Sequence, residues 1–422
     1  MIPALDSERA VGIGVYSTLG PPCHARAKAS DEDFRVEEYI AFQEVSPEEK
    51  PGYYPLYRVQ KHSIDTMHMA RELSGILRSR VSYGGLKDKR AAAIQYVTPT
   101  STRSERPPEV VMDKFSARLV GFVPRPISRG SIVGNRFEVT LRDCCREIGQ
   151  RADEALKLAS ERMMPSFYGL QRFGTSGPGT HRVGKAMVKK EFDEAVRLIL
   201  SEVRPGDNSQ TLAAKEAFRA ERYEEGLSLL SMAQDVESMV ARSLIRDPGD
   251  SVKALRHIPL NLRRLYVEAY QSAIFNETMS EAIAKGEDIS TSRPGDNWAE
   301  VSEDGMLTSE VHGAKEASAV DGVPMVQLVG YGTRDYGSRF DACINSVLDR
   351  QEIGAKDFYV KEMQEVSAEG GFRRPHMAIK DSSCDVKDGT AILRFTLARG
   401  QYATVLLREI IKPGDPESAG LA

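Results

Sequence analysis

Apolar and polar residues alternate over several short stretches near the two ends of the chain. In residues 135–143, NRFEVTLRD, the side chains of Phe137, Val139 and Leu141 face one way, and the polar residues between them face the other. This period of two is typical of a half-buried strand. Strands are predicted for residues 33–38, 81–83, 93–98, 135–143 and 391–400.

Helical periodicity dominates the rest of the chain. In residues 63–79 we expect a helix behind a Ser63 cap. Its buried face is predicted to hold Ile64, Met67, Ala70, Leu73 and Leu77. The strongest helix is predicted within 260–284, where Leu262, Leu265, Ala269 and Ala273 share one face. Further helices are predicted for 152–164, where Pro165 ends the helix, and for 191–200, 211–246, 344–365 and 401–410.

This order of elements predicts an α+β fold in which a sheet domain built from both ends of the chain is interrupted by an inserted, mainly helical domain. Residues 291–342, which are rich in glycine and short β-like runs, belong to the middle part. The length of 422 residues also exceeds that of one ordinary domain.

Composition fits a globular protein, with 41% hydrophobic and 28% charged residues. The N-terminus lacks a basic region followed by an apolar stretch, and no apolar run is long enough for a membrane span. We therefore expect a cytoplasmic protein without a membrane partner.

The five cysteines show no CxxC pair, and His62 and His68 are not spaced like a helical metal-binding pair. We therefore expect reduced, structural thiols and no metal site. The cysteines are Cys23, Cys144, Cys145, Cys343 and Cys384.

The net charge of −4 argues against a protein that coats nucleic acid indiscriminately, but cations are concentrated locally. Residues 114–142 contain six cationic residues but only one acidic residue, Glu138. The cationic residues are Lys114, Arg118, Arg125, Arg129, Arg136 and Arg142. A basic surface on an acidic body suits selective phosphate binding. A solvated, charge-balanced face is the alternative.

The segment GGLKDKRA, residues 84–91, sets one carboxylate, Asp88, among three cations on a connection between two predicted strands. It is not a Walker A loop, because no Gly-Lys-Ser/Thr ends it. Adjacent cations favour the ionised carboxylate, which is able to act as a covalent nucleophile. The alternative is a polar surface turn.

The segment SFYGLQRFG, residues 166–174, places three aromatic residues and a Gln-Arg pair around two glycines. Aromatic residues beside arginine suit stacking on unpaired bases and contact with phosphates. The alternative is a buried hinge in which the rings belong to the core and Arg172 pairs with a carboxylate. For Phe137 and Tyr402, local pattern alone favours packing.

These motifs together resemble the TruD family of pseudouridine synthases, which isomerise a uridine in tRNA, and the archaeal form is the most similar. The resemblance rests on GGLKDKRA with Gln95 following, on SFYGLQRFG and on GNRFEV, and it extends over nearly the whole chain. It implies a catalytic domain formed by residues 1–166 and 372–422, and an inserted TRUD domain of mixed helices and strands at 167–371. Ala93 and Asp31 depart from the family's usual threonine and proline.

Carried over residue by residue, the resemblance makes Asp88 the catalytic nucleophile and Phe137 an aromatic residue that lies against the flipped nucleotide. Lys28 matches an active-site lysine of the family, and Asn135 matches the amide residue of the family's G-N-x-F segment. Tyr402 matches a residue that lies near the target base. The full set of expected substrate contacts is Lys28, Asn135, Phe137, Tyr402, Lys87, Lys89, Arg90, Gln171, Arg172 and Phe173.

The expected function is therefore conversion of a specific uridine in tRNA, with position 13 suggested, to pseudouridine without a metal or organic cofactor. Base flipping would expose the uridine. Two alternatives remain: an RNA-binding protein or tRNA chaperone of the same fold with weak or no catalysis, and a protein whose basic loops bind an acidic protein partner.

Overall fold

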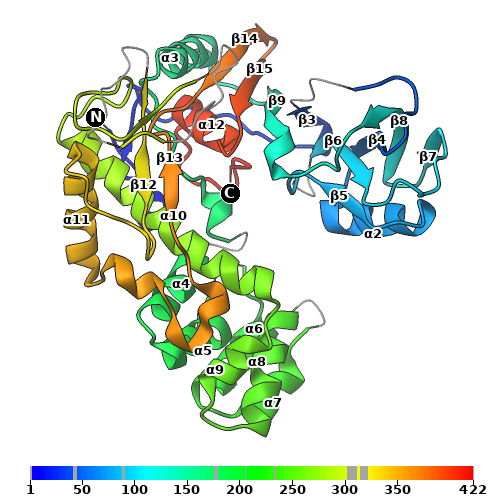
Figure 1. The fold of residues 1–422 in the computed structure, drawn as a ribbon. Helices are drawn as coiled ribbons and strands as arrows, with labels where there is room; N and C mark the ends of the chain where they lie inside the picture. Colours follow the sequence, from blue (N-terminus) through cyan, green and yellow to red (C-terminus); the bar gives the residue numbers. More distant parts are fainter. Residues whose placement is uncertain are drawn as a thin grey trace.

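The structure is a computed structural model, and Figure 1 shows its α+β architecture. The residues it describes are 2–40, 45–87, 91–174, 179–204, 206–231, 234–301, 311–313 and 322–421. Within these residues, no helix combines the length and apolar character needed to cross a membrane.

A mixed nine-stranded sheet forms the upper half of the molecule (Figure 1). Its strands in spatial order are β14 (Ile379–Lys387), β15 (Thr390–Ala398), β9 (Ile132–Leu141), β3 (Phe34–Ile40), β6 (Ala92–Pro99), β4 (Tyr54–Lys61), β8 (Phe115–Val123) and β7 (Glu109–Val111), with β5 (Val81–Tyr83) also paired to β6. All neighbours are antiparallel except β3 and β6, which are parallel. Strands from both ends of the chain therefore meet at β9 and β15.

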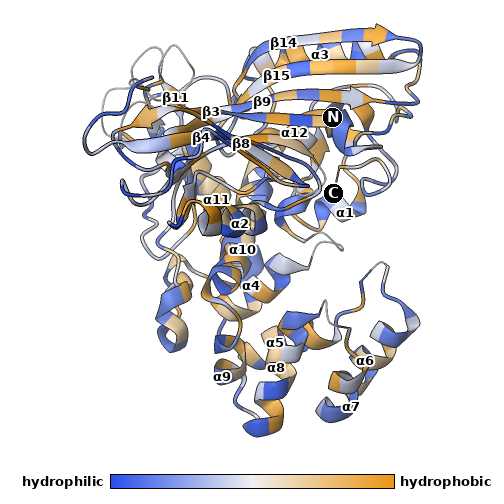
Figure 2. Ribbon diagram, turned by 90° about the vertical axis from the view of Figure 1, so that its right-hand side faces the viewer, coloured by the Kyte–Doolittle hydropathy of each residue, from blue (hydrophilic) through white to orange (hydrophobic). Residues whose placement is uncertain are grey.

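Alternation along the strands sets which face of the sheet is buried, and Figure 2 shows it as alternating hydrophilic and hydrophobic positions. Val36 on β3 is paired with Phe137 on β9 and with Ala93 on β6. Phe137 is paired in turn with Phe395 on β15. These four side chains therefore share one face, which we call the inner face.

Helices cover the two ends of the inner face. At one end, α2 (Thr66–Ile76) buries Met69 and Leu73 against strand residues such as Val59 and Val97. At the other end, α3 (Ile148–Ser160) packs on β14 and β15, and α12 (Ala403–Ile411) packs on α3. The central strands β3, β6 and β9 lie between these two covers.

The middle of the chain forms a largely helical lower part, which the long helix α10 joins to the sheet part (Figure 1). Its helices are α4 (Thr180–Val188), α5 (Phe192–Ser201), α6 (Ser209–Arg219), α7 (Tyr223–Leu229), α8 (Asp235–Arg246), α9 (Ser251–Arg256), α10 (Leu260–Ala284) and α11 (Arg339–Gln351). The short strands β10 (Trp298–Ala299), β11 (Val323–Pro324), β12 (Val326–Leu328) and β13 (Gly371–Arg373) form two small pairs. Short 3₁₀ segments lie at Asp31–Asp33, Arg129–Ser131, Leu170–Arg172, Ala355–Phe358 and Lys361–Val366.

The predicted α+β class and the mixed sheet are confirmed, and the five predicted strands are present. The domain boundaries at 166 and 371 stay predictions. The helical stretch predicted at 211–246 is present as three helices, and the sequence pattern missed β4, β8 and β14.

Three local predictions about helices were wrong. Asp65, not Ser63, caps α2, because its carboxylate accepts the backbone N–H groups of Met67 and His68 at 3.0 Å. Met67 is consequently exposed. Helix α3 ends at Ser160, two residues before Arg162 adopts a positive φ of 61°, so Pro165 does not end it.

The expectation that all cysteines are reduced was also wrong, because the sulfur atoms of Cys23 and Cys145 form a disulfide. Spacing could not reveal the pair, since 122 residues separate its members. Cys144, Cys343 and Cys384 are free.

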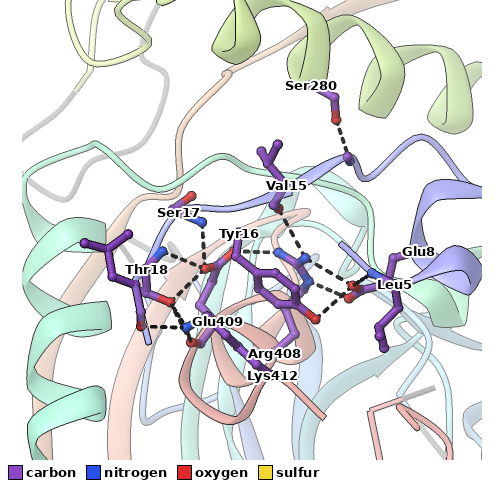
Figure 3. A network of polar contacts seen from close by, with 12 residues as sticks. Leu5, Glu8, Val15, Tyr16, Ser17, Thr18, Ser280, Arg408, Glu409 and Lys412 are labelled. Atoms are coloured by element: carbon purple, nitrogen blue, oxygen red, sulfur yellow. Dashed lines mark hydrogen bonds and ion pairs between the residues drawn. The ribbon is translucent and has the colours of Figure 1, made fainter. Parts of the chain in front are cut away.

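A buried ionic network joins the two ends of the chain (Figure 3). Arg408 of α12 donates to Glu8 at 2.6 Å and to Glu409 at 2.5 Å, and its guanidinium lies 3.9 Å from the centre of the Tyr16 ring. Glu409 also accepts the backbone N–H of Thr18. The N-terminal segment, which contains α1 (Asp6–Arg9), β1 (Ile2–Pro3) and β2 (Val15–Tyr16), is thus fixed to α12.

Candidate active site

The segment that carries Asp88 connects β5 to β6, as the sequence predicted. Asp88, Lys89 and Arg90 lie outside the described residues, so their predicted roles stay predictions. The start of the connection packs tightly: a Cβ on Gly84 would lie 2.3 Å from the Cγ1 atom of Ile132. Glycine is therefore required for this close approach.

A buried hydrogen-bond network holds residues 85–87, immediately before Asp88. The carboxylate of Glu38, on the inner face of β3, accepts the Nζ group of Lys87 at 2.8 Å and the Nε2 group of Gln95 at 3.2 Å. Gln95 also donates to the backbone oxygen of Gly85 at 2.9 Å. The Thr66 hydroxyl of α2 donates to Gln95 at 2.8 Å and accepts the backbone N–H of Lys87 at 3.0 Å.

This network corrects the role expected for Lys87. Its side chain points into the protein and pairs with the fully buried Glu38. It is therefore not positioned to contact a phosphate, and it shapes the connection instead. Lys61 of β4 also contacts this connection, because its Nζ lies 3.5 Å from the backbone oxygen of Lys87.

Lys28 lies beside the inner face, with its Nζ 4.6 Å from the centre of the Phe34 ring. Its backbone φ is 53°, and the residues around it are fixed from several directions. Arg26 exchanges two backbone hydrogen bonds of 2.9 Å with Arg142, and Ala27 donates to the backbone oxygen of Ala419 at 3.0 Å. The Cys23–Cys145 disulfide precedes them.

An ion pair fixes the turn that follows Lys28. The carboxylate of Asp33 accepts hydrogen bonds of 2.6 to 3.0 Å from the guanidinium of Arg142, at the end of β9, and one from the backbone of Ser30. The hydrogen bond from Arg142 holds the pKa of Asp33 below its usual value, with burial opposing it. The Asp33–Arg142 pair therefore fixes the turn after Lys28 to the end of strand β9.

Phe137 lies at the centre of an aromatic cluster on the inner face. Its ring is stacked on Phe395 at 5.3 Å and meets the edge of Phe34 at 5.9 Å. Unlike those two rings, which are buried, Phe137 is only half-buried. The strand pattern predicted its orientation, but the partial exposure leaves it available for stacking.

Asn135 lies two residues before Phe137 on the same face. Its Oδ1 atom is buried and has no hydrogen-bond partner among the described residues. The preceding Gly134 allows β15 to approach, because a Cβ there would lie 2.3 Å from the Leu397 oxygen. An unpaired acceptor of this kind is costly unless a ligand satisfies it.

For SFYGLQRFG, the structure favours the hinge alternative over direct RNA contact. Phe173 is fully buried, and Arg172 pairs with Glu268 of α10 at 2.8 Å. Gln171 accepts a hydrogen bond from Thr404 of α12. In this conformation Phe173 has no surface on which a base could stack, because its ring is fully buried and meets the ring of His181 in α4 at 5.4 Å.

Tyr402 belongs to this hinge and not to the Phe137 cluster. Its ring meets Tyr168 edge-on at 5.9 Å, and the guanidinium of Arg373 lies 4.0 Å from the Tyr168 ring centre. Arg373 also donates to the backbone oxygens of Ser166 and Gly400. Among the described contacts of Tyr402, none reaches Phe137, so its role near the target base stays a prediction.

Sequence reasoning missed three members of the site: Glu38, Lys61 and Thr66. Glu38 did leave a signal, because it occupies the inward parity of the strand after Phe34 and Val36. A carboxylate at a buried strand position requires a partner. Thr66 and Lys61 left no such local signal, because their partners are distant in sequence.

No group of three or more His, Cys, Asp or Glu side chains in the described part could hold a metal ion. The polar groups that surround the Asp88 connection are one carboxylate, two lysines, an amide and a hydroxyl. This donor set suits positioning and charge stabilisation.

Comparisons with known proteins concern the chain as a whole. A family model described as tRNA pseudouridine synthase D (TruD) matches residues 10–410. A protein of Pyrobaculum neutrophilum named probable tRNA pseudouridine synthase D is 31% identical over 100% of both chains. Its namesake from Methanopyrus kandleri is 32% identical, with 85% of this chain and 86% of that one covered.

A solved structure is similar over the whole length. The crystal structure of the putative TruD of Methanosarcina mazei superposes with a TM-score of 0.77 at 25% identity, and the match covers 99% of this chain and 100% of that one. The fold, the motifs and the family model agree from end to end. The chain belongs to the TruD family of tRNA pseudouridine synthases.

Proposed function

We propose that the protein converts one uridine of tRNA, at position 13, into pseudouridine, with Asp88 as the nucleophile acting on a flipped-out nucleotide. Family membership supports the reaction, and the residue roles follow from the motifs. In this isomerisation the N1–C1′ bond breaks, a C5–C1′ bond forms, C5 loses its proton and N1 gains one. No electron is transferred and no water is consumed, so no cofactor is needed.

The observation that carries the proposal is the buried network of Glu38, Lys87, Gln95 and Thr66. It fixes the backbone on the N-terminal side of Asp88 from three different elements. A nucleophile requires such support, because small displacements of a reacting group reduce the rate strongly. A polar surface turn would not require it.

The inner face supplies contacts suited to an extruded uridine. The half-buried Phe137 offers a stacking surface, which would offset part of the few kcal/mol needed to unstack the base. The Oδ1 atom of Asn135 would accept a hydrogen bond from N3–H of uracil. Lys28, which lies against Phe34, would favour the ionised form of a nearby carboxylate.

Lys89 and Arg90 are proposed to contact the phosphates beside the target nucleotide, because the network already engages Lys87. We also propose a cytoplasmic location, where tRNA is the substrate.

The test compares wild-type protein with Asp88→Asn by carbodiimide mapping of pseudouridine in tRNA and by tRNA binding. We expect the variant to bind tRNA nearly as well as the wild type but to form no pseudouridine. Asp113→Asn, which changes an exposed aspartate, is the control and should keep full activity.

Pseudouridine formation by Asp88→Asn at the wild-type rate would refute the nucleophile. Wild-type protein that binds tRNA without modifying it would instead indicate the RNA-binding or chaperone alternative. The same map locates the modified uridine.

A further inference from the structure

A cavity of about 250 Å³ lies where the N-terminal end of β9, the C-terminal end of β15 and the end of α3 meet. Its lining includes Arg136, Arg162, Arg374 and Lys380, and Asp381 is the one carboxylate among its described lining residues. The candidate active site does not use these groups. The lining is therefore strongly cationic on a chain whose net charge is −4.

Two further arginines extend the positive charge from this cavity. The guanidinium of Arg399 donates to the backbone oxygen of Arg129 at 2.7 Å, and the backbone N–H of Arg399 donates to Val133, which lines the cavity. We call Arg129, Arg136, Arg162 and Arg399 the arginine band. All four side chains are exposed.

The arginine band differs from the other arginines of the same sheet in its lack of neutralising partners. Arg35 pairs with Glu32, Arg142 with Asp33, and Arg394 with Glu138. Within the described residues, none of the four band members has a carboxylate within 4.0 Å, and Arg136 instead lies 5.0 Å from the Tyr39 ring centre. Their charges are thus presented to solvent.

The pKa of a neighbouring arginine, Arg374, is consistent with a positive potential at the cavity. The pKa of Arg374 is lowered to about 10, first by burial and then by Arg162 and Arg373. Arg374 and Lys380 have contacts of their own, so only the four exposed arginines are needed for the inference.

Arg136, the band member within a strand of the sheet, does not lie on the face that would receive the target uridine. Arg136 stands between Asn135 and Phe137 on β9, so strand alternation directs its side chain to the opposite face. A ligand of the band is therefore a different part of the substrate from the flipped nucleotide.

We propose that the arginine band is a second RNA-contact surface that binds the sugar-phosphate backbone of tRNA away from the target uridine. Guanidinium groups suit phosphate oxygens because they bind them with two parallel hydrogen bonds. The proposal rests on tRNA being the substrate. An acidic polypeptide is the competing ligand class, and the experiment below separates the two.

The test uses the full-length double variant Arg136→Gln/Arg162→Gln. Its dissociation constant for tRNA is measured between about 50 and 200 mM salt, where phosphate contacts dominate the dependence. We expect about tenfold weaker binding at the lower salt and a salt slope reduced by roughly one to two. The single-turnover rate at saturating tRNA should change less than twofold, because the inner face is intact.

Two comparisons make the test specific. Arg242→Gln, which neutralises an exposed arginine of α8, should leave tRNA binding unchanged, and a short stem-loop that contains only the target uridine should bind the double variant like the wild type. Equal tRNA affinity and salt slope in double variant and wild type would overturn the proposal. Loss of binding to polyglutamate with tRNA binding intact would also overturn it.

Failure of the proposed reaction is recognised separately, because wild-type protein would then form no pseudouridine in the same samples. A thermal unfolding midpoint unchanged in the double variant confirms that folding is not the cause of the binding loss.

Discussion

At the residue scale, the most demanding feature is the charge of Glu38 on a buried strand position. It is stabilised by Lys87 and by the N–H groups of Gln95 and Tyr96, all within 3.2 Å. A buried carboxylate with this many donors is costly to replace. Glu38 holds Lys87, the residue directly before Asp88, so it is suited to position the proposed nucleophile.

Glu38→Gln should therefore reduce kcat for pseudouridine formation by about 10- to 100-fold while KM for tRNA changes little. The amide keeps the shape of the side chain but weakens its hold on Lys87, so residues 85–87 lose their fixed position. Single-turnover kinetics at saturating tRNA measure the effect.

Glu37→Gln is the matched control, because Glu37 lies next to Glu38 on the opposite, partly exposed face, where Arg58 and the Tyr96 hydroxyl each contact it at 3.5 Å. It should change kcat less than twofold. If both variants had the same kcat as the wild type, Glu38 would not position the nucleophile.

Phe137 and Lys87 show which side-chain orientations could and could not be predicted from the sequence. Strand parity correctly oriented Phe137, because alternation is a local property. Lys87 was expected at a phosphate, yet it turns inward to a partner 49 positions earlier. Local charge patterns do not contain such distant partners.

At the element scale, α4 packs against α10 and carries a buried histidine, His181. His181 is buried beside the Phe173 ring, and burial lowers its pKa to about 4, with Arg182 and Lys185 acting in the same direction and the backbone of Ala10 opposing them. The unfolded chain binds a proton near pH 6.5, whereas the folded chain does not bind one until about pH 4.

Stability should therefore fall as the pH decreases from about 6.5 to 4, by up to about 3 kcal/mol from this residue. Denaturant unfolding of wild type and His181→Gln at several pH values measures it, and the variant should show a shallower loss over that window. His376, whose pKa is lowered to about 3, contributes in the same direction in both proteins and cancels in the comparison. Parallel curves would contradict a neutral buried His181.

The elements that the sequence missed share a physical reason. Strand β14 lies at the sheet edge and most of its side chains are exposed, so it has no apolar period. Strand β4 is buried on both faces over part of its length, which also removes the alternation. Periodicity detects elements that are half-buried, such as β9 and β15, and not these.

At the scale of the whole molecule, the two ends of the chain complete one sheet and one buried network. The parallel pairing of β3 and β6 and the disulfide between Cys23 and Cys145 depend on residues far apart in sequence. The order of predicted elements and the family resemblance both anticipated the joining of the ends, but neither predicted the strand pairing or the disulfide. The ion pairs of Arg408 with Glu8 and Glu409 stabilise the contact between the two ends of the chain.

Arg408→Met tests this closure. Removing the guanidinium leaves the buried Glu8 and Glu409 carboxylates without their cation, so the free energy of unfolding should fall by about 3–5 kcal/mol. Arg197→Met is the control: it breaks an exposed Arg–Glu pair within α5 and should cost less than about 1 kcal/mol.

Adding Glu8→Gln and Glu409→Gln to Arg408→Met should recover part of the loss, because neither carboxylate then remains buried without its cation. Recovery would identify unpaired charge, rather than lost packing, as the cause. An Arg408→Met variant no less stable than Arg197→Met would mean that the sheet holds the chain ends together without this network. Tryptophan fluorescence of Trp298, the only tryptophan, together with circular dichroism follows the unfolding in denaturant.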